Sequence, residues 1–333
     1  MTTDTAALRS PVMFYGSKAR IAEQIVALLP DHAHYVEACG GSLSVLLAKP
    51  PARMETVNDL DGHLMTFWRV LRERPADLER VCALTPHARG EHRATDLNGD
   101  LDDLERARRV WVKLTQGRSG SLRATGWRHA RTAEDGFRGP ARLASYIDRI
   151  APAAQRLRNV SLECRPAVEV LRDYGTGPRA HRTLIYLDPP YPGATRVRNY
   201  RLEATTAAAH TELAEQARAS SATVVISGYA CELYDRELYP DWYRHELPTF
   251  TTQGKGDHQR TEILWSNRPL RDDPMLTDAV EFRDNEPAPE PGCHETRCAE
   301  PSCAKVISQP RTGRPRRYCG ATCRQRARRY RTR

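Results

Sequence analysis

The spacing of apolar residues in the body of the chain, residues 11–268, predicts alternating strands and helices. Leu64, Phe67, Trp68 and Leu71 recur at helical spacing, and a similar apolar stripe in residues 19–30 ends at Pro30. Short runs rich in β-branched and aromatic residues predict strands at 35–39, 54–60, 160–164, 183–188, 223–227 and 262–267. This alternation is typical of an α/β fold with a mainly parallel sheet, whose ligands bind beyond the carboxyl ends of the strands.

Glycines follow the first of these strands directly. Residues 35–39 lead into Gly40, Gly41 and Ser42 and then into an apolar helix. Glycines at such a turn let a ligand approach the backbone, and the N-terminus of the following helix favours negative charge. The full dinucleotide pattern G-x-G-x-x-G is absent, so a purely structural turn is an equal alternative on these residues alone.

The next strand ends in two carboxylates, Asp59 and Asp61. A carboxylate at the tip of the second strand is placed to accept hydrogen bonds from ribose hydroxyls. Together with the glycine turn, this position favours the binding of a nucleoside.

The strand at 183–188 ends in Asp188, Pro189, Pro190 and Tyr191. Prolines lack a backbone donor and have a fixed φ, so they hold a rigid, extended turn. The Asp188 carboxylate and the Pro189 carbonyl then form an acceptor pair that matches the two protons of an aromatic amino group, and Tyr191 offers a ring on which the base can stack. A turn that merely ends the strand is the plainer alternative.

Composition limits the class of protein. The chain has 333 residues with 40% hydrophobic content, which suffices for one large core and a small appendage. No apolar run approaches the roughly 18 residues of a membrane span, and residues 1–10 do not resemble a secretory signal. We therefore expect a cytoplasmic protein that does not associate with a membrane.

The net charge of +9 comes from two stretches. Residues 106–142 hold 10 basic and 2 acidic residues, and residues 311–333 hold 10 basic and no acidic residues. The remainder therefore carries 31 basic and 40 acidic residues. Such separate basic regions are typical of a protein that binds nucleic acid, although a solvated arginine-rich surface is the plainer alternative for the internal stretch.

The cysteines divide in the same way. Four are scattered through the first 231 residues, and five lie in the last 41, after a segment at 269–291 whose composition predicts a flexible linker. Two close thiol pairs in the tail have the spacing of a tetrahedral zinc site: Cys298, Cys303, Cys319 and Cys323. We therefore expect a zinc-binding basic tail at residues 292–333, with Cys293 and His294 as spare ligands. From Cys298 on, about 35 residues with a G-R-P-R-x-Y-C run resemble small treble-clef-like zinc modules; an unfolded basic tail is the alternative.

The order of motifs in the body resembles the Dam-type DNA adenine-N6 methyltransferases, which use S-adenosylmethionine (SAM). The resemblance covers roughly residues 11–268 and includes FYGSK, YVEACGGS, VNDLDGHLMTFWRVL, LIYLDPPY, HTELAEQARASSATVVISGY and the closing R-x-E-x-L-W-S-N. The chain departs from the family's pattern at Ser17, where a second glycine is usual, and around Pro166, where an acidic residue is common.

The resemblance implies a Rossmann-like SAM-binding sheet formed by residues 11–72 and 150–268, with an inserted DNA-recognition region at 73–149. The cofactor-binding residues that it implies are Phe14, Tyr15, Gly16, Lys18, Glu37, Gly40, Gly41, Ser42, Asp59 and Asp188. It implies a catalytic role for Asp188, Pro189, Pro190 and Tyr191, with Tyr191 stacked on a flipped adenine. In the basic insert, the candidates for DNA contact are Arg118, Arg123, Arg128 and Arg131.

We therefore expect a monomeric, site-specific enzyme that methylates adenine N6 in double-stranded DNA of a bacterial cell, at the nucleoid. A cytosine-N4 methyltransferase would use nearly the same acceptor pair, and a silent DNA-binding protein would need only the basic regions. An NAD-dependent oxidoreductase would share the glycine turn but has no use for the D-P-P-Y turn. The residues leave open whether the enzyme has a cognate restriction endonuclease as a partner, acts alone or is phage-encoded.

Overall fold

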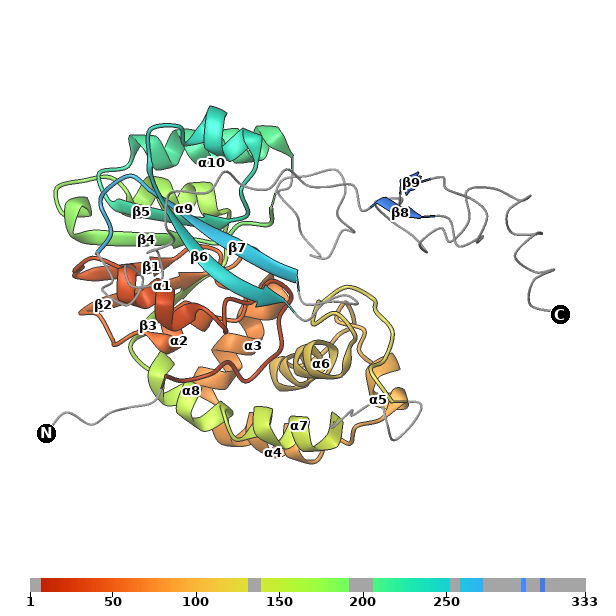
Figure 1. The fold of residues 1–333 in the computed structure, drawn as a ribbon. Coiled ribbons are helices and arrows are strands. Elements are labelled where there is room, and N and C mark those ends of the chain that lie inside the picture. Colours follow the sequence, from red (N-terminus) through yellow and green to blue (C-terminus); the bar gives the residue numbers. More distant parts are fainter. Residues whose placement is uncertain are drawn as a thin grey trace, which may run out of the picture. The chain divides into compact units, whose positions relative to one another are not determined.

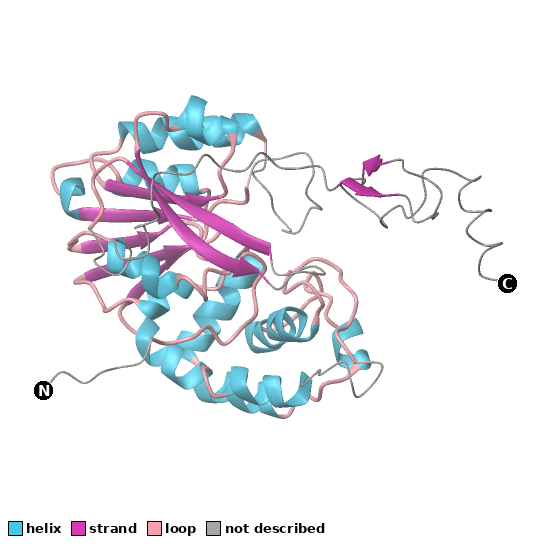
Figure 2. Ribbon diagram, viewed as in Figure 1, coloured by secondary structure: helices cyan, strands magenta, loops and turns pink. Residues whose placement is uncertain are grey.

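The computed structural model describes residues 7–130, 139–191, 206–251, 258–271, 295–297 and 306–308. The chain divides into two compact units, Met1–Asp273 and Pro274–Arg333. In the first unit the strands form one layer among helices, as Figure 2 shows. None of the described helices is long and apolar enough to cross a membrane.

A seven-stranded sheet with the order β3-β2-β1-β4-β5-β7-β6 organises the first unit (Figure 1). Strands β1 to β5 pair in parallel, and β7 runs antiparallel to both β5 and β6. The bounds are β1 His34–Glu37, β2 Met54–Asn58, β3 Val160–Glu163, β4 Thr183–Leu187, β5 Thr223–Gly228, β6 Tyr243–Thr251 and β7 His258–Ser266. The expected α/β fold with a Rossmann-like, mainly parallel sheet is confirmed.

Strand β6 was not expected from the sequence. It contains Pro248 and several charged residues, which argue against a strand. In the fold β6 stands at the edge of the sheet and pairs only with β7, with Pro248 opposite Thr261. An edge strand tolerates a missing backbone donor, so its sequence need not have the apolar pattern of the central strands.

Helices surround the sheet and follow most of the parallel strands. Asp61 begins α3 by accepting a hydrogen bond from the His63 backbone N–H, and the predicted stripe on that helix is fully buried. The bounds are α1 Ala22–Leu28, α2 Ser44–Ala48, α3 Gly62–Glu73, α4 Pro75–Ala83, α5 Arg89–Arg93, α6 Asp103–Gln116, α7 Gly139–Ile147, α8 Ile150–Leu157, α9 Ala167–Tyr174, η2 Ala180–Arg182, α10 Ala207–Ala219 and η3 Leu233–Leu238.

The buried side chain of Asn58 holds three strand ends together. Its Nδ2 donates to the carbonyls of Ala38 (2.8 Å) and Arg165 (3.0 Å), and its Oδ1 accepts from the Arg165 backbone N–H (3.0 Å). A buried amide with its donors and acceptor engaged fixes the backbone around it. The loops that follow β1, β2 and β3 are therefore held in register at the carboxyl edge of the sheet.

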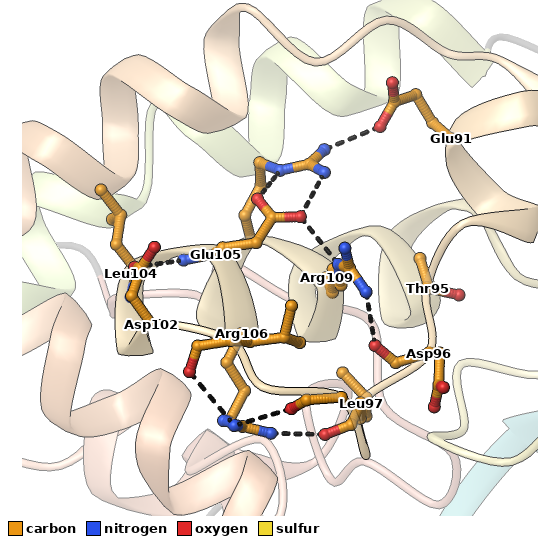
Figure 3. Close-up of polar contacts among 12 residues, drawn as sticks. Glu91, Thr95, Asp96, Leu97, Asp102, Leu104, Glu105, Arg106 and Arg109 are labelled. Carbon is orange, nitrogen blue, oxygen red and sulfur yellow. Dashed lines mark hydrogen bonds and ion pairs between the residues drawn. The ribbon is translucent and has the colours of Figure 1, made fainter.

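Between α3 and β3 the chain forms a helical insert, and Figure 1 shows its helices α4 and α7 on the opposite side of the view from α10. Several arginines of the internal basic stretch hold this insert together (Figure 3). Arg106 donates to the carbonyls of Leu97, Gly99 and Leu101. Arg108 and Arg109 pair with Glu105, and their hydrogen bonds, chiefly that of Arg108, lower the pKa of Glu105 to about 2.

These ion pairs reduce the number of free positive charges in the basic stretch 106–142. Glu105 and Glu91, the two acidic partners of Arg108, both precede the basic stretch in the sequence, Glu105 directly. The excess of +8 is therefore partly neutralised in the fold. The basic surface left for a polyanion is smaller than the sequence suggests.

In the second unit, the described residues form one antiparallel pair, β8 (Glu295–Arg297) with β9 (Val306–Ser308). The four expected zinc ligands, Cys298, Cys303, Cys319 and Cys323, lie outside the described residues. Within the described ranges, no group of three or more potential ligands is placed to hold a metal ion.

Candidate active site

A cavity of about 250 Å³ lies at the carboxyl edge of the parallel strands. Its walls come from the FYGSK loop, the β1–α2 turn, the tip of β2, residues 166–168, the turn after β4 and the start of α10. The structure brings together at this cavity all the expected cofactor residues and most of the catalytic turn: Phe14, Tyr15, Gly16, Lys18, Glu37, Gly40, Gly41, Ser42, Asp59, Asp188, Pro189 and Pro190.

The turn after β1 requires its glycines. Gly41 has φ +50°, in the left-handed region, and a Cβ on it would stand 3.0 Å from the Phe14 ring. A Cβ on Gly40 would stand 2.7 Å from Leu43 and 3.1 Å from the Asn58 carbonyl. The Trp68 indole donates to the Gly41 carbonyl at 3.1 Å. The turn is therefore tightly fixed, and Phe14 lies directly against it.

Asp59 ties the β2 tip to this turn. Its Oδ2 accepts from the Gly41 backbone N–H and its Oδ1 from that of Asp61, both at 2.9 Å. Burial nevertheless raises the pKa of Asp59 to about 6. Of the two carboxylates in this loop, Asp61 has a structural role as the cap of α3, so Asp59 is the better candidate for a ligand contact.

Glu37 is a second buried carboxyl in the cavity wall, with 2% of its surface exposed. Its Oε2 accepts from the Tyr35 hydroxyl at 3.0 Å and from the Leu46 backbone N–H at 2.9 Å. Burial raises the pKa of Glu37 to about 8, because two hydrogen bonds do not replace the hydration of a carboxylate.

Lys18 lies on the carboxylate of Asp188. Its Nζ is 2.6 Å from both oxygens of Asp188 and 2.8 Å from the Tyr191 hydroxyl oxygen. Burial alone would lower the pKa of Lys18, but Asp188 and Glu262 together raise it, so the amine is a cation at neutral pH. Tyr191 does not line the cavity wall; its ring packs on Tyr229, with ring centroids 4.7 Å apart.

Glu262 completes this group, and the sequence reasoning did not single it out. It lies on β7 and is 3% exposed. It accepts a 2.6 Å hydrogen bond from the Tyr191 hydroxyl and lies 3.4 Å from Lys18 Nζ. Burial raises the pKa of Glu262 against the opposing effect of Lys18. The sequence does point to Glu262, because it is the single acidic residue of the R-x-E-x-L-W-S-N motif.

His210 is a further buried residue that the sequence reasoning missed. It lies in the first turn of α10, lines the cavity and shares a 2.8 Å hydrogen bond through Nδ1 with the Tyr234 hydroxyl. Burial lowers the pKa of His210, although the backbone of Pro190 opposes this shift. The ring is therefore neutral at pH 7 and lies beside the turn that contains Pro190.

The insert also reaches the cavity. The Gly120 carbonyl accepts from the Tyr15 backbone N–H at 2.8 Å, and residues 120–122 form part of the cavity wall. The loop that carries these residues is closed by a bridge between Gly117 and Trp127. The insert is therefore in direct contact with the expected cofactor pocket.

The expected DNA-contact arginines lie in different surroundings. Arg118 is exposed and Arg123 is half-buried. Arg128 is half-buried, and its Nη2 donates to the Arg118 carbonyl at 2.9 Å and lies 3.0 Å from the sulfur of Met13. Burial lowers the pKa of Arg128, which remains a cation. Arg131 lies outside the described residues.

The sequence model of the D12 class N6 adenine-specific DNA methyltransferases matches residues 14–251. The chain belongs to this family. Membership supports transfer of a methyl group to adenine N6 rather than cytosine N4 or hydride transfer, with SAM as the methyl donor and DNA as the substrate. The enzyme class expected from the sequence, a site-specific adenine DNA methyltransferase, EC 2.1.1.72, fits the family.

Among curated proteins none matches the chain. Among solved structures it is similar to yhhF of Escherichia coli, named as a methyltransferase, at 11% identity over 80% of this chain and 97% of that one, with a TM-score of 0.31. A precorrin-6y C5,15-methyltransferase from Geobacter metallireducens matches at 10% identity over 80% of this chain and 95% of that one, with a TM-score of 0.30. The rRNA methyltransferase aviRa of Streptomyces viridochromogenes matches at 13% identity over 75% of this chain and 83% of that one, with a TM-score of 0.31.

The lining of the cavity suits SAM. SAM carries a positive sulfonium and a positive amino group, and the cavity wall has the carboxyls of Asp59 and Asp188 beside that of Glu37, whose raised pKa of about 8 leaves it largely protonated at neutral pH. Opposite charges close together in a partly buried site attract more strongly than in water. The acidic lining and the glycine turn therefore fit a cationic nucleoside cofactor.

Proposed function

We propose that the enzyme binds SAM against the β1–α2 turn and Asp59, and binds a flipped adenine at the turn formed by Asp188, Pro189, Pro190 and Tyr191. The position of this turn carries the proposal. Asp188 follows β4 directly and shares one cavity with the glycine turn and Asp59. In open α/β sheets, ligands bind at this edge, next to the point where the strand order reverses.

In this proposal the Asp188 carboxylate and the Pro189 carbonyl accept the two amino protons of adenine. These hydrogen bonds raise electron density on N6 and aim its lone pair at the methyl group that SAM supplies. The N6–carbon bond forms as the carbon–sulfur bond breaks, and N6 then gives up a proton to Asp188 or to water. Positioning and electrostatic stabilisation provide most of the rate enhancement.

The adenine has to leave the duplex to reach this turn, which costs a few kcal/mol of stacking. We propose that the insert holds the DNA during this step. Arg118, Arg123, Arg128 and Arg131 lie in or next to the loop that also contributes to the cavity wall, so contact with phosphates or bases there would place the target base near Asp188.

The test is product analysis. The purified full-length enzyme is incubated with DNA and labelled SAM, and the DNA is digested to nucleosides and separated by mass. Label in N6-methyl-2′-deoxyadenosine supports the proposal, and label in N4-methyl-2′-deoxycytidine would refute the base assignment. Long-read sequencing of the same DNA gives the recognition site.

For the second unit we propose a zinc module in residues 292–333, with Cys298, Cys303, Cys319 and Cys323 as ligands. The β8–β9 pair supports it, because these strands flank the first cysteine pair in the sequence. Some 40 residues bury too little apolar surface to fold alone, so metal binding would supply the folding energy. The arginines after Cys323 would add phosphate affinity that does not depend on sequence.

We further propose that the enzyme works as a monomer on the nucleoid, since one chain carries every group that the proposed reaction needs. Sedimentation with and without DNA tests this. A cognate restriction endonuclease encoded nearby, or a phage origin, would be recognised from the neighbouring genes.

A further inference from the structure

The catalytic turn is in contact with a second buried carboxylate that comes from a distant part of the chain. Lys18, Asp188, Tyr191 and Glu262 form a polar network with two carboxylates, one ammonium and one phenol, and Lys18 Nζ also donates to the Gly16 carbonyl at 3.3 Å. Lys18 is 6% exposed and Glu262 is 3% exposed, so little water reaches either charge. With both carboxylates ionised the network has a net charge of −1, so Asp188 and Glu262 share the single positive charge of Lys18.

The position of Lys18 conflicts with the proposed role of Asp188. The ammonium lies 2.6 Å from both carboxylate oxygens, where the adenine amino group has to donate. An ammonium held there also withdraws the negative charge that would activate N6. Each carboxylate oxygen has a second lone pair, but the ammonium weakens it as an acceptor, so a shift of Lys18 off one oxygen would make Asp188 a better partner for the amino group.

A buried ammonium cannot leave its carboxylate without another partner, because an unpaired buried charge costs several kcal/mol. Glu262 is placed to be that partner, since its Oε1 lies 3.4 Å from Lys18 Nζ. The same oxygen accepts the 2.6 Å hydrogen bond from the Tyr191 hydroxyl. Tyr191 Oη in turn lies 2.8 Å from Lys18 Nζ, so the ammonium can approach Glu262 while it keeps this contact.

We propose that Glu262 is a positioning residue for methyl transfer: it takes over the Lys18 ammonium when the target amino group binds Asp188, and it holds Tyr191 throughout. The inference rests on the proposed role of Asp188. No covalent bond changes in this step; one ion pair exchanges for another. Without Glu262, Lys18 remains on Asp188 and competes with the base.

The test compares four full-length proteins: the unaltered enzyme, Glu262→Gln, Lys18→Met and the double variant. Glutamine keeps an oxygen that accepts from the Tyr191 hydroxyl but loses the charge. We expect Glu262→Gln to lower the single-turnover rate constant by about tenfold or more, with the SAM dissociation constant within about twofold. In the Lys18→Met background the same change should cost less than about twofold, because the competing cation is gone.

A binding measurement covers variants that turn over too slowly. DNA with adenine at the target is compared with DNA that has purine there, which lacks the amino group. The ratio of the affinities for adenine DNA and purine DNA should fall in Glu262→Gln. In the Lys18→Met background, Glu262→Gln should leave this ratio unchanged. Equal losses in both backgrounds would mean that Glu262 only supports the fold, and that result overturns the inference.

Two controls separate the possible failures. Glu246→Gln removes an exposed carboxylate from the neighbouring strand β6 and should leave turnover unchanged. Asp188→Ala should be inactive. If Asp188→Ala stays active, the proposed catalytic turn is wrong. If it is inactive while Glu262→Gln turns over normally, only the inference about Glu262 is refuted.

Discussion

Replacing Glu37 by glutamine should stabilise the enzyme at alkaline pH. The carboxyl of Glu37 is 2% exposed, and burial raises its pKa from 4.5 to about 8. An unfolded chain ionises this group above pH 4.5, whereas the folded protein keeps it protonated until about pH 8. The contribution of Glu37 to the free energy of unfolding is therefore fully present below pH 4.5 and is lost as the pH rises toward 8.

The size of this loss follows from the two pKa values. One pH unit corresponds to about 1.4 kcal/mol, so the full difference amounts to about 5 kcal/mol, of which about 3.5 kcal/mol falls between pH 5 and pH 8. Glutamine keeps an oxygen for the Tyr35 hydroxyl and the Leu46 N–H but cannot ionise. The variant should match the unaltered enzyme near pH 5 and exceed its stability by about 3 kcal/mol at pH 8.

The assay is urea unfolding of the full chain without SAM, followed by tryptophan fluorescence at pH 5, 6, 7 and 8. All five tryptophans lie in the first unit, so the signal reports on the unit that contains Glu37. A stability difference that does not change with pH would refute a buried, protonated Glu37.

Glu55→Gln is the matched control, on the neighbouring strand β2. Burial alone would raise the pKa of Glu55, but hydrogen bonds from Arg156 and Lys49 lower it below 4.5. Its stabilising effect is present above pH 4.5 and is lost only as the pH falls toward the folded pKa. The control should therefore be less stable than the unaltered enzyme by the same amount from pH 5 to pH 8.

Three further predictions concern the catalytic turn, the insert and the tail. Asp188→Ala should lower methyl transfer by about a hundredfold or more with an unchanged melting temperature, measured by single-turnover label transfer; near-normal turnover would contradict its role. Arg118→Ala should weaken DNA binding and reduce its salt dependence at unchanged SAM affinity, whereas Arg128→Ala should weaken the binding of both DNA and SAM, because Arg128 supports the loop at the cavity. Titrations of each variant with DNA at several salt concentrations and with SAM measure these affinities, and identical effects of the two substitutions would contradict the prediction. The peptide 291–333 should bind about one zinc ion and gain structure by circular dichroism under reducing conditions, and a peptide that stays unstructured with zinc would rule out the module.

The parallel strands and the residues at their tips could be predicted from sequence because both depend on local patterns. Five apolar runs became β1 to β5, and a parallel sheet brings their carboxyl ends to one edge. Gly40, Asp59 and Asp188 therefore meet at one cavity although more than a hundred residues separate the last two. The fold needed only the right order of strands to bring them together.

Contacts between distant residues could not be predicted in the same way. Glu262 lies on an antiparallel strand, and nothing local to its sequence indicates that it faces Lys18. His210 is one polar residue in a helix whose apolar positions are otherwise alanine and leucine, and its partner Tyr234 comes from a separate segment. A charged or polar residue buried within an apolar pattern is the signal that would have identified both.

The insert shows why charge alone overstates a DNA surface. Counting charges treats each arginine as free, but Arg106, Arg108 and Arg109 are engaged by carbonyls and by the carboxylates of Glu91 and Glu105 (Figure 3). Such arginines define the shape of the insert rather than its affinity for phosphate. In our proposal, contact with DNA is then left mainly to the loop after α6.

That loop also bears on how DNA binding and methyl transfer are connected. The Gly120 carbonyl accepts from the Tyr15 N–H, and residues 120–122 form part of the cavity wall, so a shift of the loop moves the wall itself. Gly120 has φ +62°, and a Cβ there would stand 2.8 Å from Met13, the residue that also contacts Arg128. The loop therefore has little freedom to move independently of the FYGSK segment. Because Lys18 belongs to that segment and pairs with Asp188, we propose that a displacement of the loop by DNA is transmitted to the Lys18–Asp188 ion pair.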